Sequence, residues 1–274
     1  MKVRTIALSL LIGMGAFFLL YATMSAESIQ AENADFCDSV TQIPKTECEA
    51  LVDLYNATDG AHWKESTGWL VDTSPCNWYG VDCFGGNVRN LDLVYNDLSG
   101  TIPSSIGQLT NLVTLELSSN SLTDTIPVEV GNLTELEVLS LDWNDLSGEI
   151  PDSLAALTKM RHFELADNAF TGEFPAWIAG FQQLESLYMI QTKLSGGVPP
   201  ALWDIPTLEF INLYNNVNMD WTLPANLGNA TELDTLNLGQ TGLHGPIPAS
   251  IGDLTKLEFI YLPYNDLSGP LPST

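Results

Sequence analysis

Positive charge is scarce in this sequence. Its 274 residues include nine Lys and Arg against 34 Asp and Glu, and the formal net charge is −25 at pH 7. Such an acidic chain repels phosphate backbones and anionic lipid headgroups, which argues against nucleic acid or an anionic membrane surface as a partner. Two roles for the acidity remain open: solubility in a salty exterior, and attraction of a basic partner or of divalent cations.

The sequence also has few of the residues and motifs that support catalysis. Its three histidines, His62, His162 and His244, lie far apart along the chain, and CxxC spacings, nucleophile elbows and glycine-rich phosphate loops are missing. Pairs of acids act together in glycosidases, but in a repetitive chain they more often form a solvated charged face. We therefore predict a protein that is not an enzyme and that has no cofactor and no metal site.

A long uncharged segment lies at the N-terminus. Lys2 and Arg4 are followed by residues 5–26 with no charged side chain, and the core of this segment, IALSLLIGMGAFFLL, is apolar. The order is typical of a secretory signal peptide, while a membrane anchor is the alternative because 22 uncharged residues can span a bilayer. In either case we expect the rest of the chain to be secreted or displayed at the cell surface.

Cysteine is limited to four residues, all in the first third of the chain. Cys37 and Cys48 bracket one short loop, and Cys76 and Cys83 bracket another. In an exported chain four cysteines predict two disulfides. Because the members of each pair are close in sequence, we expect the bonds Cys37–Cys48 and Cys76–Cys83.

A short helix is predicted between the two cysteine pairs. Thr46 and Glu49 have the spacing of a capping box, and the dipeptide Asp59–Gly60 would end the helix. One helical face would then carry Cys48, Leu51, Val52 and Tyr55. Such a helix would cover the apolar edge of a sheet that follows it.

An eight-residue stretch recurs through most of the chain. NDLSGTIP stands at 96–103, NDLSGEIP at 144–151 and NDLSGPLP at 265–272. Its asparagine, or a threonine in the same place, recurs every 24 residues with a single step of 25, at Asn96, Asn120, Asn144, Asn168, Thr192, Asn216, Thr241 and Asn265. A fixed period in this range is typical of a solenoid built from repeated coils.

Each repeat predicts one short strand. Leucines two residues apart, as at Leu115 and Leu117, predict a strand whose leucines point inward, and one strand per coil gives a parallel sheet along the inner face. The asparagine offers a donor and two acceptor lone pairs, so it can bond backbone groups of its own coil and the next. The proline that ends each stretch fixes φ and lacks an N–H, which suits an outer segment.

The pattern L-x-x-L-x-L-x-x-N-x-L-x-G-x-I-P-x-x-L-G-x-L-x-x resembles the plant-type leucine-rich repeat, and it covers residues 88–274 as eight repeats, the last one truncated. PCNWYGVDC, at 75–83, resembles the C-x-W-x-G-V-x-C closure of that family's N-terminal cap, in which the two cysteines bond to each other. The resemblance implies an α/β repeat solenoid. It would be a right-handed coil with short parallel β-strands on its concave face and a helical, disulfide-bonded N-terminal cap. The predicted domains are then residues 1–26 as signal peptide or membrane anchor, 27–87 as cap and 88–274 as repeats.

Side chains that flank the strand leucines are expected on the concave face. The first four repeats place two aromatic and five acidic residues there: Tyr95, Trp143, Asp92, Glu116, Asp142, Glu164 and Asp167. The last four place six aromatic residues and no charge there: Tyr188, Phe210, Tyr214, Phe259, Tyr261 and Tyr264. Exposed aromatic residues on a concave face are typical of protein and carbohydrate binding sites. We predict these residues as ligand-binding, with coverage of a bare part of the sheet as the alternative.

One coil departs from the pattern. The stretch NNVNMDWTLP, at 215–224, carries the extra residue and lacks the usual Leu-x-Gly. Trp221 does not simply fit the buried place of the missing leucine, since Asp220 beside it needs solvent or a partner. We expect a bulge near Phe210 and Tyr214, either as a determinant of specificity or as a tolerated insertion.

Three Asn-x-Ser/Thr sequons, at Asn56, Asn132 and Asn229, are possible sites of N-glycosylation in a eukaryotic host.

The sequence thus predicts a non-enzymatic extracellular recognition module that binds a protein, peptide or glycan on its concave face. The resemblance implies kinship with receptor ectodomains. The chain stops inside a repeat, so either it is part of a longer protein or its last coil serves as its own cap. We favour the first, and the resemblance to receptors implies that the longer protein is membrane-attached. An alternative implied by the resemblance is a wall-associated inhibitor of a secreted polysaccharide-degrading enzyme, like the polygalacturonase-inhibiting proteins. Ice binding, known in relatives of this repeat, is disfavoured because one concave column runs Asp, Glu, Ser, Glu, Tyr, Asn, Asn, Tyr rather than as a rank of like groups.

Overall fold

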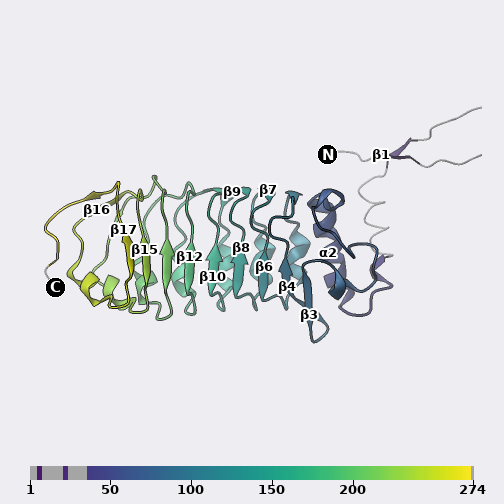
Figure 1. Ribbon diagram of the computed structural model, residues 1–274, viewed down its shortest axis with the longest axis horizontal. Helices are drawn as coiled ribbons and strands as arrows, with labels where there is room; N and C mark the ends of the chain where they lie inside the picture. The colour runs from purple at the N-terminus through teal and green to yellow at the C-terminus, as the bar shows by residue number, and fades with distance from the viewer. Residues whose placement is uncertain (1–4, 8–20, 24–35, 273–274) are drawn as a thin grey trace, which may run out of the picture.

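The computed structural model describes residues 5–7, 21–23 and 36–272 (Figure 1). Most of the predicted signal peptide or membrane anchor therefore lies outside the described residues. Two short strands near the N-terminus, β1 (Thr5–Ala7) and β2 (Tyr21–Thr23), pair antiparallel. None of the helices in the described ranges is long and apolar enough to cross a membrane.

The N-terminal cap is built on helix α2 (Lys45–Ala57), which buries Leu51. The predicted capping box is wrong. The helix begins directly after Pro44, whose carbonyl already accepts a hydrogen bond from the N–H of Glu47, and no side chain caps this end. Glu47 is itself buried, and its carboxylate accepts a hydrogen bond of 2.8 Å from the N–H of Val88, in the first coil. An acid near the helix start thus joins the cap to the sheet.

Two disulfides close the cap. The bonds Cys37–Cys48 and Cys76–Cys83 are both present, which confirms the predicted pairing. Two short 3-10 helices, η1 (Gly60–His62) and η2 (Pro75–Asn77), connect α2 to the sheet.

Tryptophan forms the core of the cap. The ring of Trp69 lies 4.9 Å from that of Trp63 and 4.8 Å from that of Trp78, and all three side chains are buried. Tyr55, on the predicted apolar face of α2, packs its ring 5.2 Å from Trp63. These aromatic pairs stabilise a segment that is too small for a large aliphatic core.

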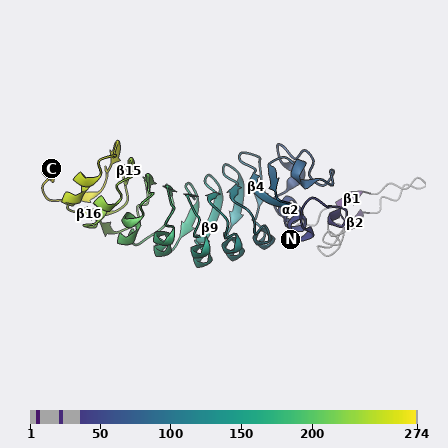
Figure 2. The same ribbon diagram turned by 90° about the horizontal axis from the view of Figure 1, so that it is seen from below.

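A nine-stranded sheet runs the length of the molecule and lines its concave face (Figures 1 and 2). From the cap outward its strands are β3 (Val81–Phe84), β4 (Asn87–Asp92), β6 (Thr114–Glu116), β8 (Val138–Ser140), β10 (His162–Glu164), β12 (Ser186–Tyr188), β13 (Phe210–Asn212), β15 (Thr235–Asn237) and β17 (Phe259–Tyr261). β3 pairs antiparallel with β4, and the later pairs are parallel. The central residues of the inner strands, such as Leu115 and Leu139, are fully buried, as the period of two predicts.

The outside of the curve carries 3-10 helices, as Figure 2 shows. They are η3 (Ser104–Gln108), η4 (Val128–Asn132), η5 (Asp152–Ala156), η6 (Ala176–Gly180), η7 (Pro200–Asp204), η8 (Leu227–Asn229) and η9 (Ala249–Asp253). Between them and the main sheet lie short parallel strands: β5 (Ser99–Gly100), β7 (Ser121–Asp124), β9 (Asp145–Glu149), β11 (Ala169–Thr171), β14 (Trp221–Thr222), β16 (Leu243–Gly245) and β18 (Asp266–Leu267). The molecule is therefore the predicted right-handed α/β solenoid with a disulfide-bonded cap.

The repeated asparagines bond successive coils to each other. The Oδ1 atom of Asn120 accepts hydrogen bonds of 3.0 Å from the N–H groups of Asn96 and Leu98, and its Nδ2 donates to the carbonyls of Leu93 and Leu117. The asparagine therefore serves its own coil and the preceding one, not the next one as predicted. The direction follows from the chain turning inward at this point, with the side chain pointing back toward the cap.

The residue before each repeated asparagine, or before the threonine that replaces it, has a left-handed backbone in all eight coils, with φ between 51° and 61°. These residues are Tyr95, Ser119, Trp143, Asp167, Gln191, Asn215, Gln240 and Tyr264. None is glycine, the residue for which this conformation costs least. The coil therefore imposes the conformation at this corner, and no sequence signal shows it.

The buried positions of the irregular coil, residues 215–224, follow the repeat pattern more closely than its sequence indicates. Met219, not Trp221, takes the place of the missing leucine, and Trp221 takes that of the usual glycine. The tryptophan is 6% exposed, and its ring stacks on Trp203 at 6.4 Å, with an angle of 11° between the ring planes. Gly197 provides the space for the Trp221 side chain, because a Cβ on this glycine would lie only 2.7 Å from the Cβ of Trp221.

The expected bulge beside Phe210 and Tyr214 is wrong. The exposed residues of the irregular coil, Val217 and Asn218, come after the concave corner, and the strand that follows, β14, pairs with β16 on the flank. Asp220 is exposed and lies 3.1 Å from the imidazole of His244 on that flank. The extra residue therefore does not face the surface on which the predicted binding residues stand.

Candidate functional site

Acidic side chains stand in a row on the concave face near the cap. Asp92 of β4 adjoins Glu116 of β6 in register, and only Ser140 of β8 separates Glu116 from Glu164 of β10. Burial, followed by repulsion from Asp92 and Glu164, raises the pKa of Glu116. Burial and repulsion from Asp142 likewise raise the pKa of Glu164. The row is thus a partly desolvated negative surface.

Positive side chains are engaged elsewhere. Within the described ranges, the ion pairs that Lys and Arg form are with acids outside this row, such as Lys159 with Glu135 at 2.6 Å and Arg161 with Glu185 at 2.6 Å. The imidazole of His162, on β10, lowers the pKa of both Glu116 and Glu164 when it is charged. The acidic row therefore has no Lys or Arg counter-charge from the part of the chain that the structure describes.

Tyr188 stands where the acidic and aromatic halves meet. Burial raises the pKa of its phenol, and the negative charges of Asp167, Asp142 and Glu164 raise it further. Asp142 accepts a hydrogen bond of 2.7 Å from the Ser140 hydroxyl. We call this meeting point of the two halves, at Tyr188, the seam. It combines an aromatic ring with carboxylates that neighbouring polar groups hold in position.

The aromatic residues of the last four repeats form two clusters. The first is the seam pair, Tyr188 and Phe210, with ring centroids 6.3 Å apart. The second is the distal trio, in which Tyr261 lies 6.1 Å from Tyr214 and 6.1 Å from Phe259. Tyr214 leans toward Tyr261, two coils further on, and therefore belongs to the distal trio.

The other three predicted aromatic residues lie at the rim and outside both clusters. Tyr95, Trp143 and Tyr264 occupy left-handed corner positions and are 69%, 54% and 74% exposed. One face of the Tyr95 ring is covered by the ammonium group of Lys64, 3.2 Å from the ring centroid, and Lys64 also pairs with Asp97 at 3.1 Å. Tyr95 is therefore engaged within the protein, while Trp143 and Tyr264 are single exposed rings.

Amide side chains surround the aromatic clusters, and the sequence analysis did not single them out. Asn212 and Asn237 accept hydrogen bonds from the N–H groups two residues on, at 3.2 and 3.3 Å. Asn215 donates to Gln191 at 3.1 Å, and Gln191 in turn donates to Asp167. The signal was present in the sequence, because several concave positions beside the aromatic residues carry amides: Gln191, Asn212, Asn215, Asn237 and Gln240.

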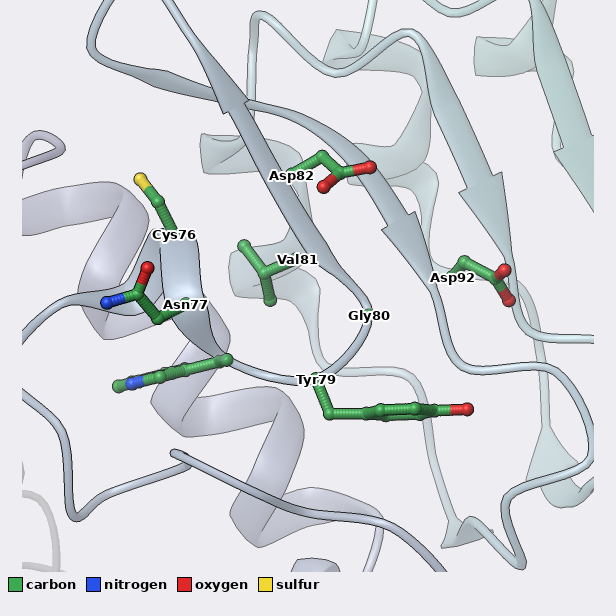
Figure 3. A pocket seen from close by; sticks show the side chains of 8 residues that line it. Cys76, Asn77, Tyr79, Gly80, Val81, Asp82 and Asp92 are labelled. Atoms are coloured by element: carbon green, nitrogen blue, oxygen red, sulfur yellow. The ribbon is translucent and has the colours of Figure 1, made fainter.

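A shallow polar cleft of about 420 Å³ lies at the cap end of the concave face (Figure 3). Tyr79, Asp82 and Asp92 line it, and Tyr79 is 43% exposed. Asp82 was not among the predicted residues, and it extends the acidic row into the cap. No group of His, Cys, Asp or Glu in the described residues is arranged to hold a metal ion.

The three sequons differ in their surroundings. Asn132 is exposed at the end of η4. The Nδ2 atom of Asn56 donates to the carbonyl of Val52 within α2, and that of Asn229 donates to Asp204. Glycosylation at these positions stays a prediction.

Comparisons with known proteins agree with this geometry. Residues 86–146 match the family described as leucine rich repeat, and residues 44–84 match the leucine rich repeat N-terminal domain. The cap and the repeats of this chain are thus similar to those of plant-type leucine-rich-repeat proteins. The repeats of this chain begin directly after the disulfide-bonded cap.

The similar curated proteins are receptor-like kinases of Arabidopsis thaliana. MDIS1-interacting receptor like kinase 1 is 36% identical over 99 residues, which are 35% of this chain and 9% of the kinase. Leucine-rich repeat receptor-like protein kinase PEPR2 is 48% identical over 56 residues, which are 19% of this chain and 5% of the kinase. The leucine-rich-repeat protein therefore matches less than a tenth of the length of either kinase.

Solved ectodomains share the fold more extensively. The Arabidopsis receptor kinase HAESA, in complex with an N-terminally extended IDA peptide hormone, is 33% identical with a TM-score of 0.69, covering 81% of this chain and 38% of that one. The GASSHO1/SCHENGEN3 ectodomain from Arabidopsis thaliana, in complex with CASPARIAN STRIP INTEGRITY FACTOR 2, is 28% identical with a TM-score of 0.64, covering 81% and 30%. A plant ice-binding protein, 19% identical with a TM-score of 0.59, covers 85% of this chain and 90% of its own and shares the fold alone.

Proposed function

We propose that this leucine-rich-repeat protein is a non-enzymatic extracellular recognition module that binds a peptide or protein segment along its concave face. The observation that carries the proposal is the seam at Tyr188, where a row of carboxylates without Lys or Arg partners meets an uncharged aromatic pair. Packing does not require this division, because these side chains lie outside the buried leucine ladder. The two disulfides fit an oxidising exterior.

The two halves favour a partner segment with basic side chains at one end and apolar side chains at the other. Burial and repulsion from neighbouring acids raise the pKa of Glu116 and Glu164, so a cationic group that reached these carboxylates would offset an existing electrostatic cost. The seam pair offers rigid ring area next to them, and aromatic residues of this kind dominate binding energy at protein interfaces. The acids would mainly raise the association rate, in a salt-dependent way.

The ectodomains with similar folds support this proposal. HAESA was solved with the peptide hormone IDA, and GASSHO1/SCHENGEN3 with CASPARIAN STRIP INTEGRITY FACTOR 2. A solenoid presents an extended inner surface suited to an extended ligand. That this chain binds such a ligand, and that it belongs to a membrane-attached protein, are both part of the proposal.

The test uses an array of synthetic peptides that vary in net charge and in aromatic and leucine content. We expect selective binding of peptides that combine Lys or Arg with apolar residues. For the peptide that binds best, the double variant Tyr188→Ala with Phe210→Ala should weaken binding by about 2 kcal/mol or more, as for buried interface anchors.

The matched control is Val217→Ala, because Val217 is 62% exposed in the irregular coil and does not lie on the concave face. This variant should bind like the parent protein. Equal affinity of the double variant and the parent, or preferred binding of acidic peptides, would contradict the proposal.

A further inference from the structure

Gly239 stands in the middle of the distal trio. It occupies the concave position that carries Tyr214 one coil earlier, and it is buried because the neighbouring rings bend over it. A Cβ on Gly239 would lie 3.0 Å from Cδ2 of Tyr214 and 3.1 Å from Cδ1 and Cε1 of Tyr261. Its backbone is not left-handed, so the chain conformation does not require a glycine here. What the glycine provides is room for the two rings to meet.

The rings therefore form one continuous aromatic surface. Tyr214 and Tyr261 close over the glycine with centroids 6.1 Å apart, and Phe259 extends the surface with its ring plane within 13° of that of Tyr261. Phe259 and Tyr261 are 48% and 39% exposed. The residues on the concave side of β13, β15 and β17 carry no charge. We call this surface, made of Tyr214, Phe259 and Tyr261 over Gly239, the aromatic platform.

Polar groups at the edge of the platform are available for a ligand. Asn212 and Asn237 use their Oδ1 atoms to accept from the backbone, and their Nδ2 groups have no hydrogen-bond partner among the residues that the structure describes. The same holds, within the described ranges, for the side-chain amide of Gln240. Donors and acceptors thus border an uncharged ring surface.

We infer that the aromatic platform is a binding subsite for a neutral sugar ring. A pyranose has a face of C–H groups that packs on an aromatic ring, and its hydroxyls both donate and accept hydrogen bonds, which suits amides and phenols. The absence of charge from the concave columns of this region selects against charged sugars. The inference does not rest on the proposed peptide site, which lies at the seam pair.

A peptide fits the platform less well than a sugar. The carbonyl of Gly239 already accepts from the N–H of Asn215 at 2.9 Å, and its N–H faces the Asn237 amide, so the backbone offers nothing for a strand to pair with. The rings also fill the space above Gly239, so there is no hole for a protruding side chain. The flat face of a sugar ring needs neither free backbone groups nor a hole for a side chain.

The experiment is titration of the protein with neutral hexaoses of glucose, xylose and mannose, followed by tyrosine fluorescence and calorimetry. Gly239→Ala keeps every aromatic group but pushes Tyr214 and Tyr261 apart, and we expect it to weaken hexaose binding at least tenfold. Tyr261→Ala should lose binding. Gly180→Ala is the matched control, because a Cβ there meets no atom within 4 Å, and it should bind like the parent.

Further measurements distinguish a free sugar from a protein-borne glycan, and the sugar site from the peptide site. Binding of a glycoprotein that carries neutral glycans, but of no free hexaose, would assign the same ring chemistry to a protein-borne glycan, provided that Gly239→Ala removes it. Tyr188→Ala with Phe210→Ala should leave sugar binding unchanged, whatever it does to peptides. Unaltered sugar affinity in a folded Gly239→Ala protein, binding of neither sugar source, or peptides as the only ligands at a Tyr261-dependent site would overturn the inference.

Discussion

At the scale of single residues, side-chain amides hold the solenoid together. Asn144 is one example: its Oδ1 accepts from the N–H of Leu122 at 2.9 Å, and its Nδ2 donates to the carbonyls of Leu117 and Leu141 at 3.0 Å. All of these groups are buried. Each of the bonds joins backbone groups that no strand ladder can reach, since the chain is turning a corner.

We therefore expect Asn144→Ala to lower the free energy of unfolding by about 3 kcal/mol, because it leaves several buried backbone groups without partners. Asn144→Thr should cost less, since Thr241 fills the equivalent place and its hydroxyl donates to Leu238 at 2.8 Å. Urea unfolding followed by circular dichroism measures both. Equal stability of the alanine and threonine variants would show that the corner hydrogen bonds do not carry this energy.

At the scale of elements, the irregular coil shows how one repeat accommodates an exception. The extra residue moves the leucine position to Met219, and the flank strand β14 then carries Trp221 where most other coils have glycine. The indole fills space beside Trp203, and its Nε1–H donates to the carbonyl of Thr241 at 3.1 Å. The coil thus accommodates both the extra residue and the large Trp221 side chain, because Gly197 leaves space for the indole.

Trp221→Ala should lower the free energy of unfolding by about 3–5 kcal/mol, the usual cost of a large core cavity. Its effect on ligand binding at the concave face should be small, because the residue lies on the flank. Guanidinium unfolding monitored by tryptophan fluorescence tests the first part, and the peptide and hexaose titrations test the second. A loss of less than about 1 kcal/mol would mean that the coil collapses to fill the space.

At the scale of the whole molecule, charge is distributed unevenly. The ion pairs of Lys and Arg in the described residues are made with acids outside the acidic row, such as Glu135 and Glu185, so the row keeps its negative charge. Desolvation of Glu164 raises its pKa above the ordinary value of 4.5. A carboxyl whose pKa is higher in the folded protein than in the unfolded chain lowers stability once it ionises. The acidic row thus costs stability at neutral pH.

Glu164→Gln should therefore stabilise the protein at pH 7, and the gain should fall away as the pH approaches 4.5 and both states take up the proton. Glu135→Gln is the control, for which we expect the opposite change in stability at pH 7. The hydrogen bond from Lys159 lowers the pKa of Glu135, so its removal should destabilise at pH 7 and have no effect at low pH. Melting curves between pH 4 and pH 8 measure both variants. Destabilisation by Glu164→Gln at pH 7 would contradict the account.

The sequence by itself determined the architecture. The return of an asparagine every 24 residues, the leucines two residues apart and the spacing of Cys76 and Cys83 predicted the solenoid, its inward strands and the cap bonds. These features are local, because each repeat carries its own strand, corner and turn. A pattern within some ten residues is enough to specify them.

Contacts between coils were decided only by the tertiary structure. Tyr214 meets Tyr261 because Gly239 intervenes, Glu47 reaches Val88 across the cap boundary, and the residue before each asparagine is left-handed whatever its side chain. Each of these depends on which group stands beside a residue one or two coils away, and on a backbone held by its neighbours. A single repeat does not contain that information, because it arises only when the coils stack.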